Sequence, residues 1–145
     1  MGAMAKPAQA GGLWLLKTEP GDFSFDDLER AASTVWDGVA NFTALRHMRD
    51  VRKGDRALIY HTGAERAAVG TATVLSDAYP DPRGDDPRIV VFDLRAGERL
   101  ARPVTLAAIK ADPAFAGWDL VRLPRLSVMP VPPALWRRMV AMGGG

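Results

Sequence analysis

Three strand-like segments follow one another in the middle of the chain, separated by turns and a loop but by no helix. They are Arg56–His61, Ala67–Leu75 and Arg88–Leu94, and the last contains an uninterrupted Ile-Val-Val-Phe core. Strands joined so directly pair antiparallel, whereas a parallel pair needs a crossover of a dozen or more residues. The pattern therefore favours an α+β fold, a curved mixed or antiparallel sheet with helices around it, over a doubly wound parallel sheet.

Shorter elements surround these strands. An apolar run at Leu13–Lys17 predicts a first strand, and Ser24 then begins a helix with Asp27 in the capping-box position. In a second helix, apolar residues recur at helical spacing and are expected to face the core: Val39, Phe42, Leu45 and Met48. The other predicted elements are a strand at Thr34–Trp36, the second helix itself at Val39–Asp50, a loop at Tyr79–Pro87, a helix from Thr105 to Asp112, a strand at Arg125–Val131 and a terminal helix from Pro132.

The composition is that of one globular domain. The chain has 145 residues, of which 48% are hydrophobic and 25% charged. We expect a single domain at residues 13–142, preceded by a disordered segment at 1–12 whose first three residues are an expression remnant. No apolar run approaches the roughly 18 residues of a membrane span. A cytoplasmic monomer without a membrane partner is the expectation.

Most catalytic and cofactor signatures are missing from the sequence. There is no cysteine, so no thiolate metal site can be built, and the two histidines, His47 and His61, do not have the H-E-x-x-H spacing. No P-loop, dinucleotide fingerprint or G-x-S-x-G elbow occurs. Glu19 and Asp37 offer a pair of carboxylates, which any chain with 17 acidic residues provides. We expect no metal, no cofactor and no catalytic residues.

Charge is unevenly distributed along a chain whose net charge is only +2. Acidic residues dominate between Glu19 and Asp37, and a basic segment follows. We assign its four cations as candidate phosphate-binding residues: Arg46, Arg49, Arg52 and Lys53. The alternative is an ordinary solvated face. The phosphate-binding interpretation is also wrong if these arginines pair with Asp26 and Glu29 inside the fold.

Rigid aromatic residues stand next to polar groups in three places. These are Trp14–Pro20 (WLLKTEP), Trp36–Asn41 (WDGVAN) and the tripeptide Tyr60-His61-Thr62. A flat ligand needs such a combination, with π faces for stacking and a few donors and acceptors that read its edge. The alternative is that Trp14 and Trp36 belong to the core with satisfied indole N–H groups. For Trp118 and Trp136 we adopt this core interpretation.

The same stretches resemble EVE domains, a branch of the PUA-like superfamily. Trp14–Pro20 is similar to the W-L-L-K-S-E-P opening of that family, and Trp36–Asn41 to its W-D-G-V-R-N. Tyr60-His61 resembles its Y-H-S strand end, and Arg125–Val128 its closing R-L-S-V. The motifs occur in the family's order. Ala40 and Phe42 depart from it, since the family has Arg and Tyr there.

The resemblance implies a PUA-like fold, a partly open β-barrel surrounded by short helices. It also implies a partner, DNA or RNA carrying a modified base, with modified cytosine in DNA foremost. The base-binding candidates transferred by motif are Trp14, Lys17, Thr18, Trp36, Asp37, Asn41, Tyr60, His61, Arg122 and Ser127. Of these, Arg122 lies in an apolar context, so we expect it to be partly buried.

Each candidate also has a purely structural interpretation. Asp37 can simply form the turn before Gly38, and Asn41 can cap the helix that follows it. Three functions therefore stay open. The first is a non-enzymatic reader of a modified base, the second a PUA-type RNA-binding module, and the third an enzyme that acts on a nucleotide or nucleobase.

Overall fold

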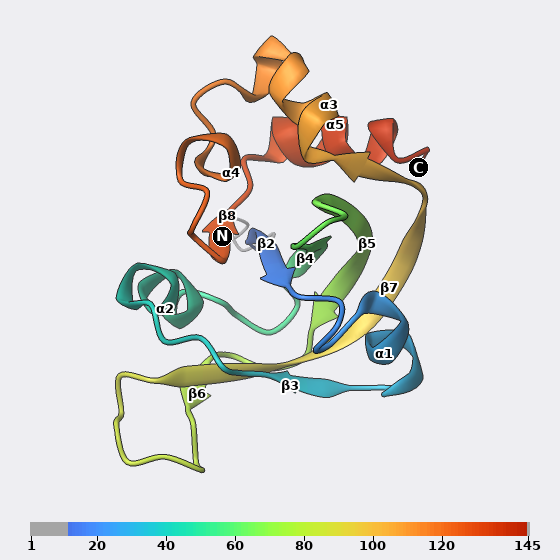
Figure 1. The fold of residues 1–145 in the computed structure, drawn as a ribbon. Coiled ribbons are helices and arrows are strands. Elements are labelled where there is room, and N and C mark those ends of the chain that lie inside the picture. Colours follow the sequence, from blue (N-terminus) through green and yellow to red (C-terminus); the bar gives the residue numbers. More distant parts are fainter. Residues whose placement is uncertain (1–11, 145) are drawn as a thin grey trace, which may run out of the picture.

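A single curled sheet forms the body of the molecule in the computed structural model, which describes residues 12–144 (Figure 1). Its seven strands have the order β3-β7-β5-β4-β2-β8, and β6 pairs with β7. They are β2 (Leu13–Thr18), β3 (Thr34–Trp36), β4 (Arg56–His61), β5 (Ala67–Val74), β6 (Tyr79–Pro80), β7 (Val90–Thr105) and β8 (Val128–Pro130). Strands β2 and β4 pair in parallel and the other pairs are antiparallel. The predicted mixed sheet is confirmed.

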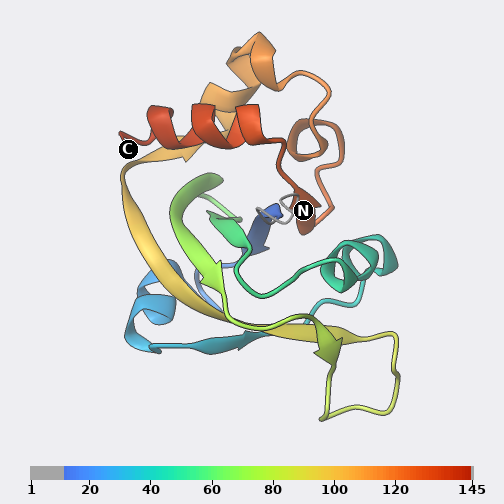
Figure 2. The ribbon, with the colours of Figure 1, turned by 180° about the vertical axis from the view of Figure 1, so that it is seen from behind.

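Short helices are placed around this half-barrel. They are α1 (Phe25–Arg30), α2 (Phe42–Arg49), α3 (Leu106–Ala111), α4 (Asp119–Arg122) and α5 (Pro133–Met142), with a 3-10 turn at Pro113–Phe115. Figures 1 and 2 show β7 running the height of the molecule, from β3 and β6 at one end to α3 and α5 at the other. Helix α4 and the 3-10 turn are not predicted from the sequence pattern. Strand β6 lies in the segment that was predicted to be a loop.

Strand β7 is much longer than the predicted Arg88–Leu94. Its second half, from Arg95 to Thr105, continues the pairing with β5, with register shifts on either side of Gly70. This half alternates irregularly between buried and exposed side chains and contains Gly97, so it carries no regular period. Backbone pairing with β5, rather than side-chain pattern, keeps it extended. Being bonded to β3 and β5, β7 is an interior strand, as predicted.

Helix α2 begins later than predicted. The Oδ1 atom of Asn41 accepts a hydrogen bond from the Ala44 N–H at 3.0 Å, which fixes Asn41 as the N-cap. Leu45 and Met48 are buried as expected, but Phe42 is 53% exposed. The prediction that Phe42 faces the core is therefore wrong. Because the helix starts at Phe42, that side chain lies on its outer surface, where the Arg88 guanidinium stacks 4.9 Å from the ring centroid.

The core fills the inside of the curled sheet. Trp118 and Trp136 are buried there, as predicted, and the Trp118 indole N–H donates to the Pro130 carbonyl. The sheet approaches α1 closely at Gly70, where an added Cβ would lie 2.4 Å from the Phe25 ring. The predicted disordered segment, residues 1–12, lies outside the described residues except for Gly12. Across residues 12–144, no helix has the length and apolar character needed to cross a bilayer.

Candidate functional site

A cavity of about 670 Å³ opens where β2 ends, next to β3 and the loop that leads to α2. We call it the Trp36 cavity. Its lining combines residues from two of the three aromatic motifs of the sequence, Trp14–Pro20 and Trp36–Asn41, with others: Lys17, Thr18, Glu19, Asp22, Phe23, Thr34, Val35, Trp36, Asp37, Gly38, Val39, Ala40, Asn41 and Ser127. The volume lies within the range of small-molecule sites in proteins.

Two aromatic rings form one side of this cavity. Trp36 is the last residue of β3, pairs with Phe92 of β7, and is 7% exposed. The Phe23 ring meets it edge to face, with centroids 6.4 Å apart and an interplanar angle of 80°. The core interpretation of Trp36 is therefore confirmed, and its position beside the cavity is compatible with the base-binding prediction. It packs in the core, and it also borders a cavity.

Asp37 and Asn41, in the loop after β3, each interact with another residue of the protein. An Asp37 carboxylate oxygen lies 2.8 Å from the Arg83 guanidinium, which also holds Asp81 at 3.0 Å. These hydrogen bonds from Arg83 lower the pKa of Asp81. The Asn41 cap uses only the side-chain oxygen, so its amide NH₂ is not consumed by the helix. The predicted Asn41 cap is therefore confirmed, whereas Asp37 pairs with Arg83 rather than forming a turn before Gly38, and both residues lie on the cavity wall.

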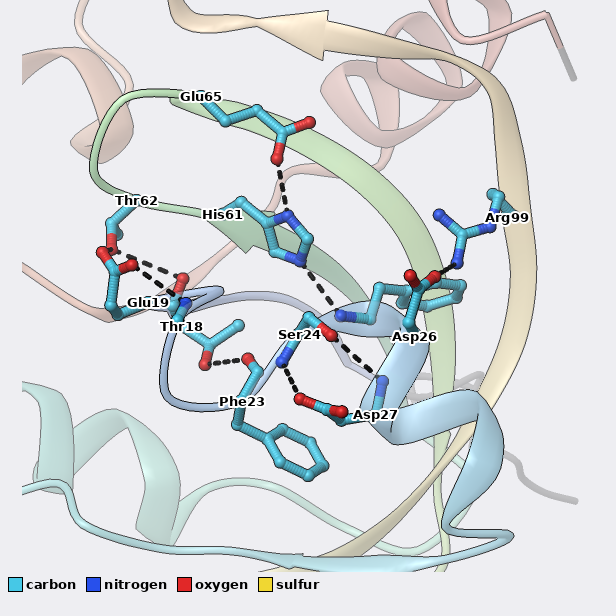
Figure 3. Close-up of polar contacts among 12 residues, drawn as sticks. Thr18, Glu19, Phe23, Ser24, Asp26, Asp27, His61, Thr62, Glu65 and Arg99 are labelled. Carbon is cyan, nitrogen blue, oxygen red and sulfur yellow. Dashed lines mark hydrogen bonds and ion pairs between the residues drawn. The ribbon is translucent and has the colours of Figure 1, made fainter.

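The end of β2 supplies an ammonium group to the same cavity. Lys17 Nζ donates to the Pro124 carbonyl at 2.9 Å, and its backbone N–H donates to Ser127. Burial lowers the pKa of Lys17. The Thr18 hydroxyl donates to the Phe23 carbonyl at 2.7 Å, which ties the Phe23 backbone to the strand end (Figure 3).

His61 holds helix α1 in place and does not line the Trp36 cavity. Its Nε2 lies 3.0 Å from the Phe25 backbone N, and its Nδ1 lies 2.7 Å from a Glu65 carboxylate oxygen (Figure 3). A backbone N–H can only donate, so Nε2 is the acceptor and Nδ1 carries the proton towards Glu65. The helix itself starts with the predicted capping box of Ser24 and Asp27. His61 thus has a positioning role next to the Phe23 turn.

Trp14 lies in the core and does not line the Trp36 cavity. Its indole N–H donates to Asp55 Oδ2 at 2.8 Å, and the Asp55 carboxylate also accepts from the Gly12 and Arg52 backbone N–H groups. Asp55 is 2% exposed. Three N–H donors stabilise this buried carboxylate. The core interpretation of Trp14 therefore describes its position, in contrast to the stacking wall that the sequence suggested.

Tyr60 and Arg122 also lie away from the Trp36 cavity. Tyr60 is buried in β4 beneath Lys17, whose Nζ is 5.6 Å from the ring centroid. The side chain of Arg122 is 59% exposed and forms an ion pair with Asp119 at 2.8 Å. The expectation that Arg122 is partly buried is wrong, because α4, which the sequence analysis missed, turns this residue outward and supplies its acid.

The basic segment is exposed along α2 and the turn after it. Arg46, Arg49, Arg52 and Lys53 form no ion pair with any residue in the range 12–144. Arg49 and Arg52 donate to backbone carbonyls, which leaves their charge uncompensated. The acids Asp26 and Glu29 pair with Arg99 instead.

Comparison with known proteins now identifies the family. The model of the EVE domain matches residues 12–142. The chain belongs to the EVE domain family. The solved structure of Rpa0253 from Rhodopseudomonas palustris is similar to it, with a TM-score of 0.87 and 41% identity over 92% of this chain and 93% of that one. The fold expected from the resemblance, a PUA-like partly open barrel with short helices, is confirmed.

A human relative provides a second comparison for the EVE domain. Human thymocyte nuclear protein 1 is 27% identical over 124 residues, which are 68% of this chain and 55% of that protein. The chain thus spans about half the length of this curated relative. The structure of human THYN1 in complex with 5-methylcytosine-containing DNA superposes with a TM-score of 0.84 at 23% identity, covering 92% of this chain and 98% of that one. At this identity the match establishes the shared fold.

The EVE domain brings six of the ten base-binding candidates together at the Trp36 cavity: Lys17, Thr18, Trp36, Asp37, Asn41 and Ser127. Sequence reasoning missed Phe23, Glu19 and Asp22 on the same wall. Phe23 directly precedes the Ser24 N-cap, and it joins the wall through its contact with Trp36. Within residues 12–144, no cluster of three or more His, Asp or Glu side chains is arranged to hold a metal ion.

Proposed function

We propose that this EVE domain binds nucleic acid and accepts a modified base, foremost a modified cytosine of DNA, in the Trp36 cavity. The observation that carries the proposal is the convergence of the Trp36 and Phe23 rings with the Asp37 carboxylate and the Asn41 amide at one cavity. Enzymes and readers that take a base out of the stack bind it by stacking and by hydrogen bonds to its edge. The 5-methylcytosine DNA complex of the fold relative human THYN1 supports the choice of ligand.

The polar groups of the cavity match the edge of cytosine. A carboxylate such as Asp37 accepts from the cytosine N4 amino group. The Asn41 amide NH₂ and the Lys17 ammonium are donors for the O2 and N3 acceptors. A methyl group at C5 is apolar, and we expect it to contact the apolar side chain of Val39, which also lines the cavity.

Contacts in the site offset the free energy needed to take a base out of a duplex. Extruding a base from a duplex costs a few kcal/mol, and stacking on an aromatic side chain returns about 1–3 kcal/mol. Edge hydrogen bonds and phosphate contacts of the exposed basic segment supply the remainder. Arg46 and Arg49 belong to helix α2, which Asn41 caps, so the proposed phosphate-binding surface starts at the cavity rim.

A binding module fits the cavity better than an enzyme does. Glu19 and Asp37, the carboxylate pair taken as an example from the sequence, both line it, but each has a structural partner. Glu19 accepts from the Gly21 N–H at 3.0 Å, and Asp37 pairs with Arg83. These contacts use the acids to shape the loops around the cavity.

The test is a binding screen with matched oligonucleotides, DNA and RNA, carrying cytosine, 5-methylcytosine or 5-hydroxymethylcytosine at one position. We expect the tightest binding to a modified-cytosine DNA, and a changed order of preference in Asp37→Asn, because edge contacts carry discrimination. Asp85→Asn, in the exposed β6–β7 loop, is the matched control. Preference for an RNA would favour the PUA-type RNA-binding function, and equal binding of all bases would contradict the proposal.

A further inference from the structure

A second cavity shares Lys17 with the Trp36 cavity. It encloses about 260 Å³ and is bordered by Lys17, Tyr60, Arg66, Lys110 and Pro124, among others. We call it the Lys110 cavity. Arg66 comes from the β4–β5 turn and Lys110 from the last turn of α3. Three separate elements therefore bring their cations to one place.

The two cavities have opposite electrostatic character. The Trp36 cavity has three carboxylates in its wall, Glu19, Asp22 and Asp37, and Lys17 as its cation. The wall of the Lys110 cavity has three cations and no carboxylate. None of Lys17, Arg66 and Lys110 forms an ion pair with a residue in the described part of the chain. A concave site with uncompensated positive charge attracts an anion.

Tyr60 adds a buried hydroxyl group to this wall. The residue is 2% exposed, and its hydroxyl makes no hydrogen bond to any residue between 12 and 144. Every fully enclosed side-chain nitrogen or oxygen in that range has a partner, so the Tyr60 hydroxyl keeps some exposed surface, and Tyr60 lines this cavity. Burial raises the pKa of Tyr60, with the Arg66 charge acting in the opposite direction. The group therefore stays protonated and is available as a donor.

The backbone presents Arg66 in a fixed conformation. Arg66 has φ of +44°, in the left-handed region that non-glycine residues rarely adopt. Its carbonyl accepts from the Leu106 N–H at 2.8 Å, which ties the β4–β5 turn to the start of α3. Residues held in such conformations are concentrated at functional sites. The link also keeps Arg66 and Lys110, on the helix that Leu106 begins, in a constant arrangement.

We propose that the Lys110 cavity binds a phosphate group, namely a backbone phosphate of the nucleic acid whose base occupies the Trp36 cavity. The assignment to nucleic acid rests on the proposed function. Lys17 lies between the two cavities, as the sugar lies between base and phosphate in a nucleotide. Ammonium, guanidinium and hydroxyl donors are the groups that bind phosphate oxygens. A free phosphate or a mononucleotide has the same chemistry, and the experiments separate these sources.

The first experiment titrates inorganic phosphate into the full chain and follows backbone amide shifts by NMR. We expect saturable shifts at Tyr60, Arg66 and Lys110, which Lys110→Ala abolishes. Arg137→Ala removes an exposed cation of α5 that lines neither cavity and should change nothing. Arg66→Asn provides a second variant, because Asn tolerates a positive φ. Shifts that are absent, or that persist in Lys110→Ala, would overturn the site.

The second experiment uses a DNA oligonucleotide in which single phosphates flanking the modified base are replaced by uncharged methylphosphonates. At one position, the replacement should weaken binding to the unmodified protein by about tenfold, the worth of one charge-assisted contact. Binding to Lys110→Ala should be weaker throughout and insensitive to that replacement. If phosphate shifts occur but no methylphosphonate matters, the source is a free phosphate or nucleotide, and the nucleic-acid assignment is wrong.

The two proposals fail in different ways. Phosphate binding at the Lys110 cavity without any preference for modified bases would contradict the proposed function and leave the anion site standing. A preference for modified bases that depends on Trp36, with no phosphate shifts and no methylphosphonate effect, would contradict the anion site alone. Melting temperatures of Lys110→Ala and Arg66→Asn close to that of the parent would exclude unfolding as the cause of lost binding.

Discussion

The Phe23 and Trp36 rings meet edge to face, with centroids 6.4 Å apart and an angle of 80° between their planes. This contact joins the turn before α1 to the end of β3, two segments that the sheet brings together. It orients Trp36 without covering it entirely, since the ring still borders a cavity of about 670 Å³. Edge-to-face pairs contribute about 0.5–1.5 kcal/mol beyond their buried area. The wall on which we expect a base to stack is thus fixed before binding.

Trp14 and Trp36 are expected to respond differently to the same substitution. Trp14→Phe removes the indole donor from the buried Asp55 carboxylate and should destabilise the domain by about 1.5–3 kcal/mol. Its affinity for DNA should not change, because Trp14 does not line the Trp36 cavity. Urea unfolding and DNA titration of the same variant measure both quantities. A loss of DNA affinity in a folded Trp14→Phe variant would contradict this and show that Trp14 contributes to binding.

Gly70 tests the packing between α1 and the sheet. An alanine Cβ there would lie 2.4 Å from the Phe25 ring, so Gly70→Ala should destabilise the domain by about 1–3 kcal/mol through overpacking. Gly84→Ala is the matched control, because no atom lies within 4 Å of the Cβ it would add. Its stability should change by less than about 1 kcal/mol. Equal stabilities in chemical unfolding would show that the α1 contact is looser than described.

The raised pKa values of both tyrosines predict a stability change in alkali. A hydrogen bond to Asp93, burial and nearby acids raise the pKa of Tyr79 to about 12, and burial raises that of Tyr60. Folding favours the protonated phenols, so their contribution is complete below the ordinary pKa near 10 and is lost as pH rises towards 12. Tyrosinate absorbance should therefore appear above pH 10, and Tyr79→Phe should remove the increase expected near pH 12. Half-ionisation of both phenols at about pH 10 would contradict the Tyr79–Asp93 contact.

The exposed basic segment predicts a salt-dependent affinity. The logarithm of the association constant should fall against the logarithm of salt concentration, with a slope of about 0.7–0.9 for each phosphate neutralised. Reversing the charge of Arg46 and Arg49 together should lower that slope and weaken binding to all sequences alike. The control is reversal of the charge of Arg30, which lies outside the basic segment and already pairs with Asp27. A flat salt dependence would exclude this surface from phosphate binding.

Much of the fold could be predicted because it is local. Neighbouring residues determine the capping box at Ser24, the cap at Thr105 and the short strand that ends at Trp36. The second half of β7 is not determined in this way, because its extension depends on pairing with β5, whose partner residues lie from 22 (Thr73 with Arg95) to 38 (Ala67 with Thr105) positions away, with register shifts that break the side-chain period. The outward position of Phe42 follows from a helix start that the apolar spacing alone does not fix.

The site was predictable where one motif supplies several wall residues. Trp36, Asp37 and Asn41 come from a single stretch and line one cavity. Trp14 was placed with Lys17 because they share a motif, but the two are three residues apart in β2 and point to opposite faces of the sheet. Phe23 joins the site through tertiary contact with β3, which no local pattern reveals.

The affinity ratio between a DNA duplex with one 5-methylcytosine and the same duplex with cytosine tests the central claim most directly. We expect the parent domain to favour the modified duplex, Trp14→Phe to keep that ratio, and Trp36→Ala to lose it, with a loss of affinity of about 1–3 kcal/mol from stacking. Because Trp36 is buried, thermal unfolding must show that the variant is folded at the temperature of the titration. A folded Trp36→Ala variant that still prefers the 5-methylcytosine duplex as strongly as the parent would contradict base capture in the Trp36 cavity.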